Sequence, residues 1–231
     1  MTGSHPFLAS TNGFRFTNSW PSEPAVTLPT PFGTINIGDA SSGLCGGMVF
    51  AALDHWYNRR LPLADRPAPG TPLYEFLVRR IVDSWNIPVG VVQYFSWMNL
   101  PDADTVFDAF GRHVTVERGV ASRTVNQQWP QVKHDLDQGV PSPLGIVTVR
   151  SGRLADIGLN HQVLAYAYTE TASAVTLRVY DPNRGPRDDV TIGFDTDRPA
   201  GATAFRHTLD ISHGVRGFFR STYTPVLPPV G

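Results

Sequence analysis

The chain has 231 residues, of which 41% are hydrophobic, and it carries one cysteine and a formal net charge of −1. This length and apolar content are enough for one sizeable core. The absence of a basic excess argues against binding to nucleic acid or to an anionic membrane surface, and a single cysteine excludes an intramolecular disulfide.

The first residues, up to Phe16, contain neither a basic segment nor a continuous apolar stretch, so we expect no secretory signal. No run of about 18 apolar residues occurs, so we expect no transmembrane helix. These absences favour a cytoplasmic protein, although export without a signal, or a signal that has been removed, stays open. Residues 1–31 are rich in proline, serine and threonine and predict an extended arm, with a short strand at 14–18.

The next informative segment contains the only cysteine, Cys45, where a polar, glycine-bearing loop meets an amphipathic pattern. Apolar residues at helical spacing predict a helix over about 45–58. Cys45 would then lie at the first turn, where free N–H groups and the helix dipole stabilise a thiolate, the nucleophilic form of cysteine. Gly46 and Gly47 are poor helix formers, and one reason to keep them would be close approach of a substrate backbone. The simpler alternative is a buried, unreactive cysteine.

Further helices are predicted in the first half of the chain. A buried stripe beginning at Leu73 predicts a helix over about 72–86. Residues 87–112 are ambiguous. Their first part, up to residue 98, suits a buried helix or a strand, and we favour a helix because 102–110 also has a helical pattern. A strand is expected at 114–117, and a helix at 126–138, with Pro130 in its first turn and Gly139 at its end.

The second half of the chain has the alternation typical of strands. Strands are predicted at 144–149, 161–168, 175–181, 189–194, 204–211 and 214–220. The sequence therefore predicts an α+β domain over 32–231, with a helical half at about 45–138 packed against an antiparallel sheet at about 141–220.

A nucleophilic cysteine needs a base and a group that orients the base. Among the seven histidines, His161 opens a predicted strand, and Asp181 closes the next one. In an antiparallel hairpin the start of one strand lies beside the end of the next, so Asp181 can reach His161. Each residue has an alternative role: His161 could bond a backbone carbonyl at the edge of the core, and Asp181 could only start a turn. Asn183 is another candidate for the orienting group.

Cysteine at a helix start, histidine opening a strand and Asp181-Pro182-Asn183 after the next strand together resemble a papain-like cysteine peptidase. The closest similarity is to the double-glycine-leader peptidases of bacteriocin export and their stand-alone relatives. It covers short islands within about 32–195. The resemblance implies a papain-like fold, with Cys45 as nucleophile, His161 as general base and acid, Asp181 as the orienting group, and a peptide or protein as substrate.

The chain departs from this family at one position. The family usually has a glutamine shortly before the cysteine that stabilises the oxyanion, and here that position holds Asp39. An ionised carboxylate only accepts hydrogen bonds, so Asp39 would have to be protonated. Alternatively, Asn36, Ser41 or Ser42 would have to replace it.

The sequence shows no metal-ligand spacing and no phosphate-binding loop, so we expect neither metal nor cofactor. The first hypothesis is a thiol hydrolase or acyltransferase acting on a peptide or other amide. The second is a catalytically silent papain-like module that binds a peptide or a partner protein, and the third is a structural domain whose arm wraps a partner. The oligomeric state is not predicted.

Overall fold

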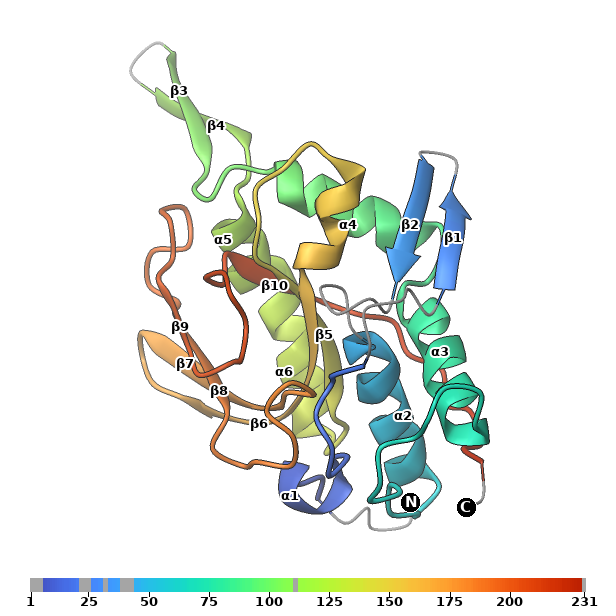
Figure 1. Cartoon of the computed structure of the whole chain (residues 1–231). Helices are drawn as coiled ribbons and strands as arrows, with labels where there is room; N and C mark the ends of the chain where they lie inside the picture. Colours follow the sequence, from blue (N-terminus) through green and yellow to red (C-terminus); the bar gives the residue numbers. More distant parts are fainter. Residues whose placement is uncertain (1–5, 21–25, 31–32, 38–43, 110–111, 230–231) are drawn as a thin grey trace.

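The computed structural model describes residues 6–20, 26–30, 33–37, 44–109 and 112–229. Helices and a curled antiparallel sheet make up the fold, so the predicted α+β class is confirmed. In Figure 1 the helices α2 (Cys45–Tyr57) and α3 (Pro72–Ser84) lie side by side next to the sheet. No helix in the described part of the chain has both the length and the apolar character needed to cross a membrane.

The N-terminal segment packs against the rest of the molecule over residues 6–20, so this part of the predicted arm is not separate from the core. It contains one short helix, α1 (Ala9–Asn12), and the strand predicted at 14–18 is absent. Phe7, Phe14 and Phe16 are buried in the same core as α2. These rings insert into the core from an irregular segment, so their alternation with polar residues does not correspond to a strand here.

A hairpin that the sequence did not indicate follows the N-terminal segment. Strands β1 (Val26–Thr30) and β2 (Gly33–Ile37) pair with each other as a separate two-stranded sheet, without a further partner among the described strands. Pro29 lies within β1, which is possible because a strand of a two-stranded sheet has a free edge where no N–H donor is needed.

Helix α4 (Val89–Asn99) agrees with the helix favoured for 87–98. The helix predicted at 102–110 is wrong: β3 (Thr105–Ala109) pairs there with β4 (Arg112–Glu117). Phe107 lies opposite Val114, and both side chains are exposed. The hairpin projects from the molecule (Figure 1), so no core surface was available to hold an amphipathic helix in this segment.

Helix α5 (Val120–Arg123), the π-helical turn η1 (Thr124–Gln128) and helix α6 (Trp129–Asp137) form one continuous helical segment. The main sheet then follows, and its strands occur at all six predicted places: β5 (Ser142–Val147), β6 (His161–Glu170), β7 (Ala174–Tyr180), β8 (Thr191–Asp195), β9 (Phe205–His207) and β10 (Gly217–Arg220). Their order across the sheet is β10-β5-β6-β7-β8-β9, and every pair is antiparallel. The short 3₁₀ segment η2 (Leu154–Leu159) lies between β5 and β6.

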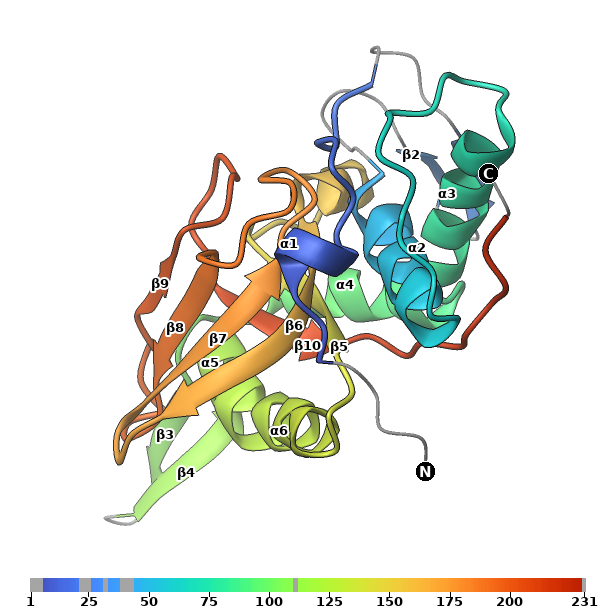
Figure 2. The same ribbon diagram turned by 90° about the horizontal axis from the view of Figure 1, so that it is seen from below.

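Helices cover both faces of this sheet. Figure 2 shows α2 and α4 on one side and α5 and α6 on the other. Alternate residues of β6 divide accordingly: Leu164 belongs to the core shared with α2 and α3, whereas Val163 and Ala165 belong to the core shared with α6. Helix α2 is therefore enclosed between the sheet and α3, and only its ends approach the surface.

Candidate active site

Cys45 is the first residue of α2, and its side chain is partly exposed. The rest of α2 is buried from Gly46 to His55, so packing fixes the position of its first residue relative to the sheet. The Leu44 side chain just before it is fully buried. Because the first amides of a helix have no partner within the helix, the N–H of Cys45 lies where a ligand oxygen can accept a hydrogen bond.

His161 and Asp181 meet at one end of the antiparallel pair of β6 and β7. His161 begins β6, and Asp181 directly follows β7. The distance from His161 Nε2 to Asp181 Oδ1 is 2.8 Å. This contact leaves Nδ1 as the ring nitrogen that can exchange a proton with another group.

The carboxylate of Asp181 is fully buried and accepts three hydrogen bonds. His161 Nε2 and the backbone N–H of Asn183 donate to Oδ1, the latter at 2.9 Å, and the N–H of Asp210 donates to Oδ2 at 3.0 Å. Burial on its own would raise the pKa of Asp181, but the nearby charge of His161 and these hydrogen bonds lower it below its usual value. Asp181 is therefore ionised at neutral pH.

The electrostatics of His161 bring Cys45 into the same cluster. Burial opposes the charged ring, yet the negative charges of Asp181 and Cys45 and hydrogen bonds to both raise the pKa of His161 to about 10. Tyr94 of α4 lies beside them: its hydroxyl donates to the His161 carbonyl at 3.1 Å. Burial, followed by the charge of Cys45, raises the pKa of Tyr94 well above its ordinary value. The structure thus gathers the sulfur, the imidazole and the carboxylate from three separate elements.

The two glycines after the cysteine serve helix packing. A Cβ on Gly46 would lie 2.3 Å from Ser84 Oγ and 2.7 Å from the side-chain amide of Gln162. A Cβ on Gly47 would lie 2.2 Å from the backbone oxygen of Leu77 in α3. Both glycines therefore face protein, and they allow α2 to pack closely on α3 and β6. The sequence-based explanation, close approach of a substrate backbone, is not needed.

The predicted oxyanion residues are largely outside the described part of the chain. Asp39, Ser41 and Ser42 all fall in the segment 38–43, and Asn36 belongs to β2. Asn183, the alternative orienting residue, does not contact the ring of His161 in any described bond. Its backbone holds Asp181, and its Nδ2 donates to the carbonyl of Asp210 at 2.8 Å.

Two residues near the site were missed by sequence reasoning. Tyr94 lay in an apolar run with nothing to separate it from other core residues. Asn18 belongs to the predicted arm, and its Oδ1 accepts the N–H of Leu44 at 2.7 Å. Neither residue has a local sequence signal, because the partners of both lie far along the chain.

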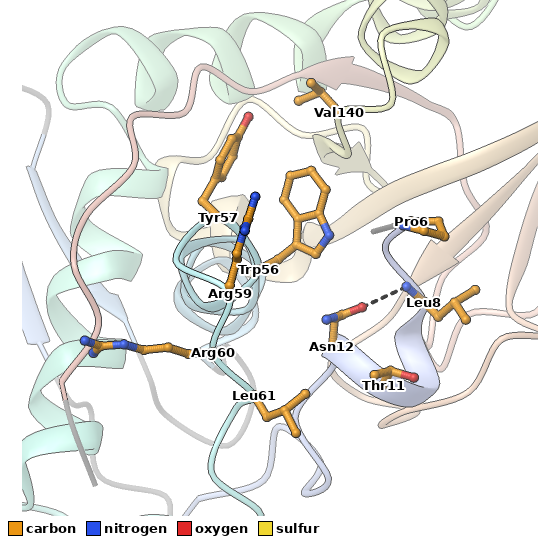
Figure 3. Close-up of a pocket in the computed structure, with 10 residues that line it drawn as sticks. All are labelled: Pro6, Leu8, Thr11, Asn12, Trp56, Tyr57, Arg59, Arg60, Leu61 and Val140. Atoms are coloured by element: carbon orange, nitrogen blue, oxygen red, sulfur yellow. Dashed lines mark hydrogen bonds between the residues drawn. The ribbon is translucent and has the colours of Figure 1, made fainter. Parts of the chain in front are cut away.

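A cavity of about 550 Å³ lies elsewhere. Figure 3 shows residues that line it: Trp56 and Tyr57 at the C-terminal end of α2, Arg59 just after the helix, and Pro6, Leu8 and Asn12 of the N-terminal segment. At about 1.5 Å per residue, α2 separates this cavity from Cys45 by roughly 18 Å. Within the described ranges, no group of three His, Cys, Asp or Glu residues could hold a metal ion. The cavity is therefore not part of the cluster of Cys45, His161 and Asp181.

In comparisons with known proteins, no family model, no curated protein and no solved structure gave a significant match to this chain.

Proposed function

We propose that this protein is a papain-like thiol hydrolase that cleaves a peptide or another amide through Cys45, His161 and Asp181. The observation that carries the proposal is the position of His161, bonded to a buried carboxylate through Nε2 and interacting with the sulfur of Cys45. A cysteine nucleophile, a base beside it and a third group that orients the base are the signature of triad catalysis. The arrangement of a central helix that begins with cysteine and packs on an antiparallel sheet supports the papain-like fold.

The proposed reaction has two halves. The sulfur of Cys45 attacks the carbonyl carbon of the amide, and the resulting oxyanion accepts a hydrogen bond from the N–H of Cys45. The imidazolium of His161 then gives its Nδ1 proton to the leaving amine as the C–N bond breaks, which leaves a thioester on Cys45.

In the second half, neutral His161 takes a proton from water, and the water oxygen attacks the thioester. The C–S bond breaks, the acid is released, and the sulfur and the imidazolium are restored. Asp181 stays ionised throughout and holds the ring through Nε2. Another nucleophile in place of water would make the same site an acyltransferase.

A mechanism-based probe tests the proposal without knowledge of the substrate. A peptidyl epoxysuccinate should add its mass once to the native protein, with Cys45 as the labelled residue. We expect no labelling of Cys45→Ala, and labelling at the rate of an ordinary thiol after unfolding in urea, because the unfolded chain no longer joins the three groups. Native protein that reacts no faster than the unfolded protein would contradict the proposal.

The second candidate function is a silent module that binds a peptide or a partner protein. Asp39, at the position where the similar peptidases have glutamine, favours it, since an ionised carboxylate cannot donate to an oxyanion. Slow probe labelling combined with a biological phenotype that Cys45→Ala leaves intact would favour this candidate over the hydrolase.

A further inference from the structure

Asn18, in the N-terminal segment, joins the two halves of the candidate site. Its Oδ1 accepts the N–H of Leu44 at 2.7 Å, and its Nδ2 donates to Asn183 Oδ1 at 3.0 Å. Its own backbone N–H donates to the carbonyl of Pro182 at 2.9 Å. The half-buried side chain of Asn18 thus bonds the residue before Cys45 and Asn183 beyond Asp181, which lie far apart in the sequence.

The bond to Leu44 fixes the start of α2. Among the described residues no side chain caps this helix, and Leu44, whose N–H Asn18 accepts, is the residue immediately before Cys45. Leu44 is therefore held by the core through its fully buried side chain and by Asn18 through its backbone N–H. The direction in which the Cys45 side chain points therefore depends on both of these contacts of Leu44.

The bonds to 182 and 183 reach the carboxylate of Asp181. Asn183 donates its N–H to Asp181 and its Nδ2 to the carbonyl of Asp210, whose N–H donates to the other oxygen of Asp181. These bonds form a closed ring around the carboxylate. Asn18 bonds Asn183, a member of this hydrogen-bond network, and is linked through the network to Asp181, which orients His161.

Packing anchors the segment independently of Asn18. Phe14 and Phe16 are buried, and the N–H of Phe14 donates to the hydroxyl of Tyr180 at 3.3 Å. At Gly13, a Cβ would lie 2.8 Å from the ring of Tyr180, so the backbone approaches that ring closely. The three bonds of Asn18 are therefore additional to what keeps the segment in place, and all three are directed at the candidate site.

We propose that Asn18 is a positioning residue that keeps Cys45 in register with Asp181 and His161; this inference rests on the proposed function. A small displacement of a nucleophile from its base is costly, since misplacement by about 1 Å can reduce a rate by roughly 100-fold. Asn18 acts through the backbone of Leu44 and through Asn183, without touching the reacting atoms.

The test is the rate at which iodoacetamide alkylates Cys45 between pH 6 and pH 8, on protein shown by circular dichroism to be folded. Asn18→Ala should slow alkylation at pH 6 by roughly tenfold and make the rate rise with pH. The matched control is Ser10→Ala, which removes a hydrogen bond from the same segment to Asp188, away from the site. We expect this control to keep the wild-type profile, even where both variants lose similar thermal stability.

A double-mutant cycle tests the route of the effect. If Asn18 acts through Asn183, the double variant Asn18→Ala/Asn183→Ala should be slower than Asn183→Ala by much less than the factor found for Asn18→Ala alone. Fully multiplicative effects would overturn the coupling. A wild-type profile like that of a free thiol would overturn the proposed function and this inference with it. A nearly flat wild-type profile that Asn18→Ala leaves unchanged would overturn this inference alone.

Discussion

Replacing His161 with alanine is expected to convert the alkylation of Cys45 from a rate nearly independent of pH between pH 6 and 8 to one that rises about tenfold per pH unit. Asp181 and Cys45 raise the pKa of His161 to about 10, so the ring stays positively charged over this whole interval. The sulfur therefore keeps its cationic partner in the wild type. Without the ring, the sulfur loses the positive charge that stabilises the reactive thiolate.

His134→Ala is the matched control for this experiment, because His134 is exposed on α6, away from the cluster. Its profile should match the wild type. The low-pH rate is the informative quantity, since a thiolate held in an ion pair is intrinsically less nucleophilic than a free one at high pH. A steep profile in the wild type, or no change on His161→Ala, would contradict an interaction between the sulfur and the ring.

The second large effect is expected from Asp181→Asn. The two oxygens of Asp181 accept from three donors, whereas an amide has one oxygen and presents N–H groups at its other end. At least one donor is then left facing another donor in a buried place, which costs about 1–3 kcal/mol of unfolding free energy. Loss of the negative charge also lowers the pKa of His161 and frees the ring to turn. We expect labelling by the peptidyl probe to fall by up to about 10⁴-fold, as when the acidic member of a triad is lost.

Asp210→Asn separates the role of the carboxylate from general effects on this turn. Asp210 contacts Asp181 and Asn183 through its backbone, and its side chain is exposed. This control should change neither the labelling rate nor the midpoint of urea unfolding by a measurable amount. Equal losses in the two variants would show that the turn, and not the charge of Asp181, determines reactivity.

The parts of the site that the sequence predicted depend on short local patterns. Alternation beginning at His161 and ending at Asp181 predicted two strands, and antiparallel pairing then required their ends to meet. The change from a glycine-bearing loop to helical spacing at Cys45 predicted where α2 starts. In each case a few neighbouring residues carry the information, and the structure has β6 and α2 beginning at those residues.

Other features depend on tertiary context that the sequence does not display. The segment 102–110 has a helical pattern, but β3 within it lies away from the core and pairs with β4. Phe14 and Phe16 alternate as in a strand, yet they insert into the core from an irregular segment. Asn18 has no local pattern at all, because its partners lie 26 and 165 residues away in the chain.

The central claim is that the ring of His161 forms an ion pair with the sulfur of Cys45 while Asp181 holds its far side. Nitrogen-15 NMR of the histidine rings, with His161 assigned through His161→Ala, measures the charge of this ring directly. We predict an imidazolium at pH 7 in the wild type that loses its proton only near pH 10, and a lower pKa in Cys45→Ala, because one of the two negative charges is gone. A neutral His161 ring at pH 7, or a titration that Cys45→Ala leaves unchanged, would contradict the claim.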